Sequence, residues 1–106
     1  MTERQRLPNR REHEVFEFEH SGMRCRAGIG RFEDGRLAEV FLNIAKDGSA
    51  VDIHARDAAV AASLALQHGC EAETLRRALI RDGSGRASGI LGAALDRIAV
   101  PEVRSP

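Results

Sequence analysis

A chain of 106 residues with 16 basic and 16 acidic side chains is the size of one small domain with one core. Its hydrophobic share of 42% and charged share of 30% are typical of a folded protein and exclude a disordered one. The balanced charge argues against general nucleic-acid binding. No apolar run approaches the roughly 20 residues of a membrane span. We therefore expect one globular domain that binds neither nucleic acid nor membrane.

The two cysteines, Cys25 and Cys70, form neither a CxxC pair nor a zinc-ligand spacing. Isolated cysteines without a recognisable secretory signal indicate a reducing compartment, so we expect a cytoplasmic protein. The residue spacings also predict no metal and no cofactor. No Ser-His-Asp or Cys-His arrangement stands out. The sequence therefore assigns no catalytic residue and favours no independent enzyme activity.

Three regions follow one another along the chain. Residues 1–12 form a polar N-terminal arm, whose arginines could touch phosphates but are more simply solvated. Residues 13–100 form the domain, and residues 101–106 form a tail that begins at Pro101.

Alternating apolar and polar residues before and after His20-Ser21-Gly22 predict a β-hairpin. The acidic outer side of its first strand then faces Arg24 and Arg26 of the second, and Cys25 lies on the core side. A turn at Asp34-Gly35 leads into a third strand over 37–44. Phe41 is opposite in phase to the apolar residues of that strand, which indicates a strand that is central or partly covered on both sides.

Ser49, with Asp52 three residues later, predicts the start of a long helix that ends before Gly69. This helix is apolar nearly all round, which predicts burial. Two further helices are expected over 71–80 and 88–99. The order βββααα predicts an α+β fold, in which a three-stranded antiparallel meander is followed by three helices packed on one sheet face.

The turn Lys46-Asp47-Gly48-Ser49 precedes the long helix, where free N–H groups attract anions. A Walker loop would need GxxxxGK[ST], so a turn with a helix cap is the simpler interpretation. That interpretation leaves Lys46, the single lysine of the chain, unexplained. Arg31 and Arg36, on either side of the Asp34-Gly35 turn, could hold a phosphate or carboxylate, although solvated charges explain them too.

Several stretches resemble the TSCPD domain, which is similar to a C-terminal module of adenosylcobalamin-dependent ribonucleotide reductases and also occurs alone. They are RLPNRR (6–11), GRFEDGRLAEVFLN (30–43), KDGS (46–49), ARDAAVAASLALQHG (55–69) and LRRALIRDGSGRASGILGAALD (75–96). Positions that match the family pattern are Gly30, Arg31, Phe32, Asp34, Gly35, Glu39, Lys46, Gly48, Ser49, Ser63, Leu64 and Gly69. No catalytic role transfers to any of them, and the chain has no Thr-Ser-Cys-Pro-Asp string.

The resemblance implies a role near deoxyribonucleotide synthesis, as a non-catalytic accessory or interaction domain whose partner is a cobalamin-dependent reductase chain. A second copy of this chain is the other candidate partner. The alternative is a small regulatory domain that binds a nucleotide or another anion through Lys46, Ser49, Arg31 and Arg36.

Overall fold

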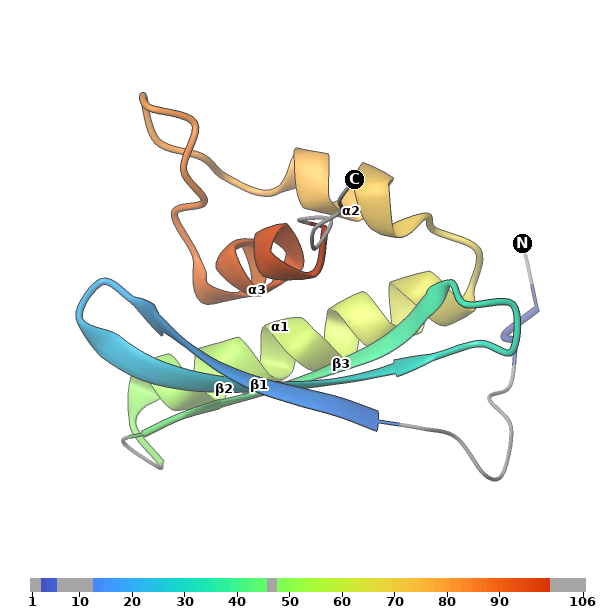
Figure 1. Ribbon diagram of the computed structural model, residues 1–106, viewed down its shortest axis with the longest axis horizontal. Helices are drawn as coiled ribbons and strands as arrows, with labels where there is room; N and C mark the ends of the chain where they lie inside the picture. Colours follow the sequence, from blue (N-terminus) through green and yellow to red (C-terminus); the bar gives the residue numbers. More distant parts are fainter. Residues whose placement is uncertain (1–2, 6–12, 46–47, 100–106) are drawn as a thin grey trace, which may run out of the picture.

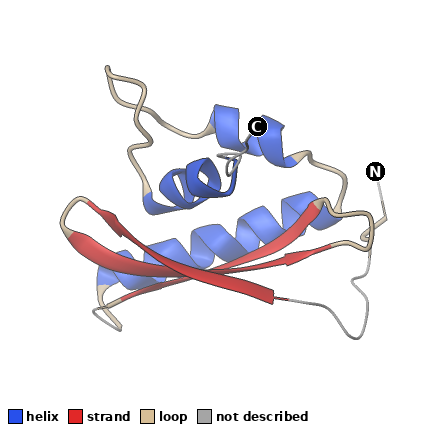
Figure 2. Cartoon of the chain, viewed as in Figure 1, coloured by secondary structure: helices blue, strands red, loops and turns tan. Residues whose placement is uncertain are grey.

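The computed structural model describes residues 3–5, 13–45 and 48–99 (Figure 1). Its elements are β1 (His13–His20), β2 (Met23–Arg31), β3 (Leu37–Ile44), α1 (Ala50–Gln67), α2 (Ala72–Ala78) and α3 (Ile90–Ala99). The strands form one antiparallel sheet in the order β1-β2-β3, and the helices lie on one side of it (Figure 2). The predicted α+β meander with three following helices is confirmed.

The core lies between the sheet and the helices. Its sheet side comes from alternate residues of the strands, and its helix side comes mainly from alanines and leucines of α1 and α3. Small side chains on α1 allow the helix backbone to approach the sheet closely. Cys25 is among the most buried side chains, and this burial raises the pKa of its thiol. The prediction that Cys25 faces the core is confirmed.

The opposite face of the sheet carries no helix and is called here the open face. On it Glu17 pairs with Arg26 and Glu19 with Arg24 across β1 and β2, as the alternating pattern predicts. The guanidinium of Arg24 also donates to the carboxylate of Glu17 over 3.1 Å. These exposed pairs contribute little to the free energy of unfolding, but they keep the open face polar at this end.

The long helix α1 packs against β3 and bonds to its free edge. Asp52 accepts a hydrogen bond from the Ile44 N–H at 3.0 Å, and the Gln67 amide donates to the Ala38 carbonyl at 3.0 Å. Between them the Ser63 hydroxyl accepts from the Val40 N–H and donates to the Val40 carbonyl. Partial cover on both sides agrees with the burial of Glu39 on the open face, but the other possibility, that β3 is a central strand, is wrong. It is an edge strand whose free side is covered by polar side chains of the helix that follows it.

The prediction that the long helix α1 is buried on nearly all sides is also wrong. Ile53, Val60 and Leu64 are exposed large apolar residues on the side of α1 that faces away from the sheet. The expectation failed because the apolar composition of a helix does not say which of its sides the rest of the chain covers. The helix end was predicted correctly, since Gly69 follows it with φ +102°.

Both later helices are shorter than expected. The segment between them turns at 82–85, where the carboxylate of Asp82 accepts from the Ser84 and Arg86 N–H groups. It returns to α3 through a bridge between Arg81 and Ala87. The turn lies between the two helices expected over 71–80 and 88–99, and only the ends of those ranges differ from the observed helices.

The predicted arm and tail lie mostly outside the described residues, so their boundaries stay predictions. Within the described part of the arm, the Gln5 N–H donates to the Gln67 carbonyl at the end of α1 over 2.7 Å. No helix among the described residues is both long and apolar enough to cross a bilayer.

The open face contains a close contact between Gly30 and Glu39, which are partners in the β2–β3 register. A methyl group at position 30 would lie 2.9 Å from Cγ of Glu39 and would overlap its carboxylate. Glu39 is itself buried. We therefore expect Gly30→Ala to lower the free energy of unfolding by about 1–3 kcal/mol, the usual cost of overpacking. Urea unfolding followed by circular dichroism measures this change.

Gly28→Ala is the matched control, because a methyl there would meet Phe41 at 3.7 Å, an ordinary contact. Combining Gly30→Ala with Glu39→Ala should restore part of the loss, and this appears as coupling in a double-mutant cycle. Equal effects of the two glycine substitutions would contradict the proposed contact.

Candidate functional site

The predicted anion-binding arginines form part of the β2–β3 turn. The guanidinium of Arg36 donates to the carboxylate of Asp34 at 2.7 Å and stacks on the Phe32 ring at 4.7 Å. Arg31 donates to the Gly35 carbonyl at 3.1 Å, and Gly35 adopts φ +94°. The backbone N–H of Arg36, and then its side chain, lower the pKa of Asp34. These motif residues are thus used to build the turn.

The cap of α1 is built as the sequence predicts. The Ser49 hydroxyl accepts from the Asp52 N–H at 3.1 Å, and Gly48 has φ +77°. The carboxylate of Asp52 accepts from the N–H groups of Ile44 and Gly48, and these bonds lower its pKa. An anion therefore already sits beside this turn, supplied by the chain itself.

Arg56 adds a weaker contact to the same carboxylate, with 3.4 Å between the guanidinium and Asp52. The two residues lie one helical turn apart, at i and i+4, where opposite charges attract each other. Lys46 lies outside the described residues, so its place relative to Asp52 and Arg56 stays open.

The predicted anion-binding residues do not form one cluster. Arg31 and Arg36 flank the turn before β3, whereas Ser49 follows the end of β3. A strand of this length spans roughly 25 Å, which separates the two ends. A ligand role for either end stays a prediction, but one small anion cannot contact both.

Two further motif positions, Gly30 and Glu39, belong to the open face. The Nε2 atom of His13 lies 3.0 Å from a carboxylate oxygen of Glu39, and the His13 ring packs edge-on against Phe41. Gly30 leaves the space that the Glu39 side chain fills. Their match to the family pattern is explained by this packing.

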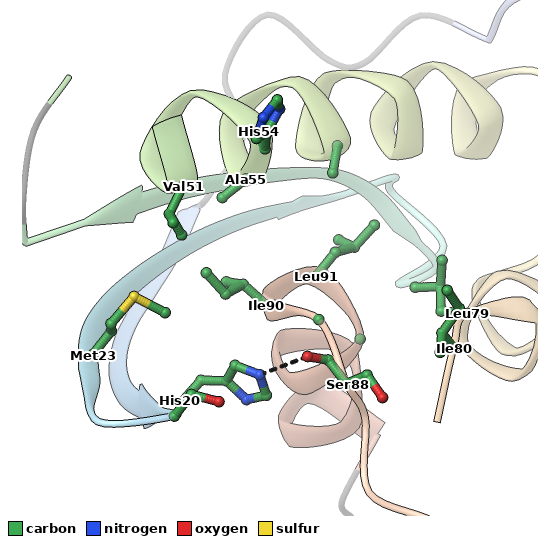
Figure 3. A pocket seen from close by; sticks show the side chains of 14 residues that line it. His20, Met23, Val51, His54, Ala55, Leu79, Ile80, Ser88, Ile90 and Leu91 are labelled. Carbon is green, nitrogen blue, oxygen red and sulfur yellow. Dashed lines mark hydrogen bonds between the residues drawn. The ribbon is translucent and has the colours of Figure 1, made fainter. Parts of the chain in front are cut away.

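An apolar groove of about 590 Å³ lies between the first hairpin, α1 and the segments around α3 (Figure 3). Met23 of β2, Val51 of α1 and Ile90 of α3 point into it, and Leu79 and Ile80 lie on its far side. The imidazole Nε2 of His20 lies 3.0 Å from the Ser88 carbonyl, which connects the first hairpin to the segment before α3. We call this hollow the apolar groove. Its size is that of sites that bind small molecules or side chains of a partner.

An ion-pair network fixes one wall of the apolar groove. The carboxylate of Asp96 in α3 accepts from Arg81 at 2.7 Å and from Arg76 at 3.0 Å. Arg81 follows directly after Ile80, so the network holds the segment that carries this exposed residue. Hydrogen bonds from Arg81, and then from Arg76, lower the pKa of Asp96.

The apolar groove was not found from the sequence, because its walls come from four separated segments. The one available signal was the apolar excess of α1. Its polar lining residues include His20, His54 and Ser88, and the His20 ring is hydrogen-bonded to the Ser88 carbonyl. In the described part of the chain no group of three or more His, Cys, Asp or Glu side chains could hold a metal ion. The groove offers mainly apolar surface, which favours the binding of apolar groups.

Comparison with known proteins places the chain beside one class of enzyme, the vitamin B12-dependent ribonucleotide reductases. The reductase of Agrobacterium fabrum is 37% identical over 71 residues, which are 67% of this chain. That of Bradyrhizobium diazoefficiens is 35% identical over 69 residues, which are 65% of this chain. The chain spans about 6% of the length of these relatives, so it is similar to a small region of each. No protein-family model and no solved structure matches it.

The buried carboxylate of Asp52 makes stability depend on pH. Its pKa is lower in the folded chain than in the unfolded chain, so its contribution is complete above the ordinary Asp value of about 3.9. That contribution is lost as the pH falls through the lower folded-state value. We expect Asp52→Asn to lower the melting temperature by several degrees at neutral pH and to weaken its fall in acid, as measured by calorimetry across pH.

Asp57→Asn is the control, since Asp57 is an exposed carboxylate of the same helix. It should leave both the melting temperature and its pH dependence nearly unchanged. If the melting temperatures of Asp52→Asn and of the unaltered chain fall in parallel as the pH is lowered, Asp52 is not the group that causes the loss of stability in acid.

Proposed function

We propose that this chain is a TSCPD domain that acts in ribonucleotide reduction by binding a B12-dependent reductase chain, without catalysing a reaction of its own. The observation that carries the proposal is the similarity to one small region of two such reductases. A region within a large enzyme has surfaces that contact the rest of that enzyme. A related domain on another chain can use the same surfaces to bind it.

The apolar groove is the surface that we assign to this contact. Ile80 is 77% exposed on its rim, and Val51 is 42% exposed on the opposite wall. Covering a side chain such as Ile80 is worth about 1.5–3 kcal/mol. Exposed apolar residues around a hollow of this kind are typical of protein-binding sites. The occupant is an apolar segment of the reductase.

Size-exclusion chromatography with light scattering tests the proposal, using this chain mixed with the B12-dependent reductase of the same organism. We expect co-elution, and we expect Ile80→Asp to abolish it because the substitution puts a charge on the groove rim. Ile80 is exposed, so the fold should survive this change. Val15→Asp alters another exposed apolar residue, which is 59% exposed and lies on the open face, and should leave binding intact. Absence of co-elution with and without nucleotides would overturn the proposal.

The alternative function is a small regulatory domain that binds nucleotides or other anions. The side chains of Arg31 and Arg36 keep exposed guanidinium surface at the β2–β3 turn, which supports it. If it holds, nucleoside triphosphates should raise the melting temperature. Arg31→Ala with Arg36→Ala should remove that increase if the turn is the site, and Lys46→Ala should remove it if the α1 cap is.

A further inference from the structure

The side of α1 that faces away from the sheet carries a row of exposed side chains, which we call the α1 stripe. Ile53, Val60 and Leu64 in this row are 49%, 59% and 42% exposed, and the exposed Asp57 lies between the first two. Steps of four, three and four residues keep the four side chains on one side of a helix. Contiguous exposed apolar surface of this kind marks an interaction site.

The α1 stripe is separate from the apolar groove, because none of its four residues lines that groove. On its other side, Val60 and Leu64 border a hollow between α1 and β3, whose charged lining residues are Arg4, Glu39 and Arg56. Two of these three charges are already engaged within the chain. Glu39 is buried with His13 Nε2 at 3.0 Å, and the Arg4 Nε donates to Gln67 at 2.6 Å.

The third charge, on Arg56, remains available beside the stripe. Its side chain is 55% exposed, and its contact with Asp52 is 3.4 Å long. The carboxylate of Asp57 has neither an ion-pair nor a hydrogen-bond partner among the described residues. The stripe therefore presents one acidic and one basic group that a partner with the opposite charges complements.

The pattern of the α1 stripe is the same when it is read in either direction. Its steps are symmetric about the midpoint between residues 58 and 59. A second α1 that lies antiparallel to the first therefore presents a matching row, with Ile53 opposite Leu64 of the second copy and Asp57 opposite Val60. Side chains with this spacing pack as in a coiled coil, where two helices bury one seam between them. The exposed residue beside the seam, Ala61, is too small to hold the helices apart.

Charge favours the antiparallel orientation over the parallel one. In a parallel pair each residue meets its own counterpart, so two Asp57 carboxylates would repel each other in the middle of the seam. In the antiparallel pair each Asp57 lies one helical turn, about 6 Å along the axis, from Arg56 of the second copy. An arginine side chain spans that distance. The chain also has 16 basic and 16 acidic side chains, so no net charge keeps copies apart.

We propose that the α1 stripe is the interface of a homodimer, in which the α1 helices of two copies pack antiparallel about a two-fold axis. The seam is short, about 17 Å from Ile53 to Leu64, and its one carboxylate per copy costs stability. The dimer is therefore weak, with a dissociation constant on the order of 100 µM, since stable interfaces bury roughly 800 Å² per partner. The inference does not rest on binding to a reductase, which is assigned to the apolar groove.

Sedimentation velocity of the full chain, from about 5 µM to about 1 mM, tests this inference. The mass should rise from the 11.6 kDa of one chain toward twice that value. Val60→Asp puts a carboxylate opposite Asp57 of the second copy, and Ile53→Asp puts one at the end of the seam. Each should raise the dissociation constant about tenfold or more.

Ile80→Asp is the matched control, because it changes an exposed apolar residue outside the α1 stripe and should leave the dimer unchanged. Val60 and Ile53 are exposed in the single chain, so the fold should survive their substitution. Circular dichroism verifies that all three variants remain folded.

Cross-linking distinguishes the two orientations. Ile53→Cys and Leu64→Cys chains, both with Cys70→Ser, are mixed and treated with a short bis-maleimide, while Cys25 is buried. The antiparallel dimer gives a cross-linked product from the mixture and little from either variant alone. Cross-linking of each variant to itself would contradict the antiparallel arrangement.

A chain that stays monomeric at every concentration would overturn the inference, as would self-association that both seam variants leave intact. If the chain alone is monomeric and Val60→Asp abolishes co-elution with the reductase, the α1 stripe binds the reductase and the inference also fails. Dimerisation without co-elution would leave this inference standing while the proposed function fails.

Discussion

The carboxylate of Asp52 fixes the position of α1 on β3, and the rest of the domain depends on that position. It bonds to the end of β3, to the turn at Gly48 and to Arg56, and Ser49 bonds to its backbone. These contacts fix where α1 begins relative to the last strand. Ser63 and Gln67 lie further along the same helix, so their contacts with Val40 and Ala38 follow from that starting point. One buried acid thus sets the register of helix against strand.

The position of α1 explains why the domain has two hollows. The helix lies over the edge of the sheet instead of its middle, so one side of it faces α3 and the first hairpin, and the other faces open space along β3 (Figure 1). The apolar groove forms on the first side, and a second hollow of about 420 Å³ lies between α1 and β3. The apolar groove has mostly apolar walls, whereas half of the residues around the second hollow are polar or charged.

Local patterns in the sequence predicted the strands, the cap at Ser49, the helix end at Gly69 and the burial of Cys25, because each depends on neighbouring residues. Phe41 was placed on the correct face of the third strand, but its phase does not reveal whether that strand is central or at an edge. Burial around Val60 and Leu64 was wrong for a related reason: composition does not say what covers a helix. The contact between Gly30 and Glu39 and the long reach of Asp52 to Ile44 depend on tertiary distances that spacing alone does not give.

The two edges of the sheet are protected in different ways. At β3 the following helix occupies the free hydrogen-bonding groups, so protection there is steric and independent of salt. At the other edge, β1 pairs with no second neighbour among the described strands, and its residues include Glu14, Glu17 and Glu19. Glu14 is paired with Arg31 and Glu17 with Arg24, so a second strand that added at this edge would have to desolvate charged groups. High ionic strength weakens interactions between exposed charges, so the protection of the β1 edge depends on salt, whereas that of the β3 edge does not.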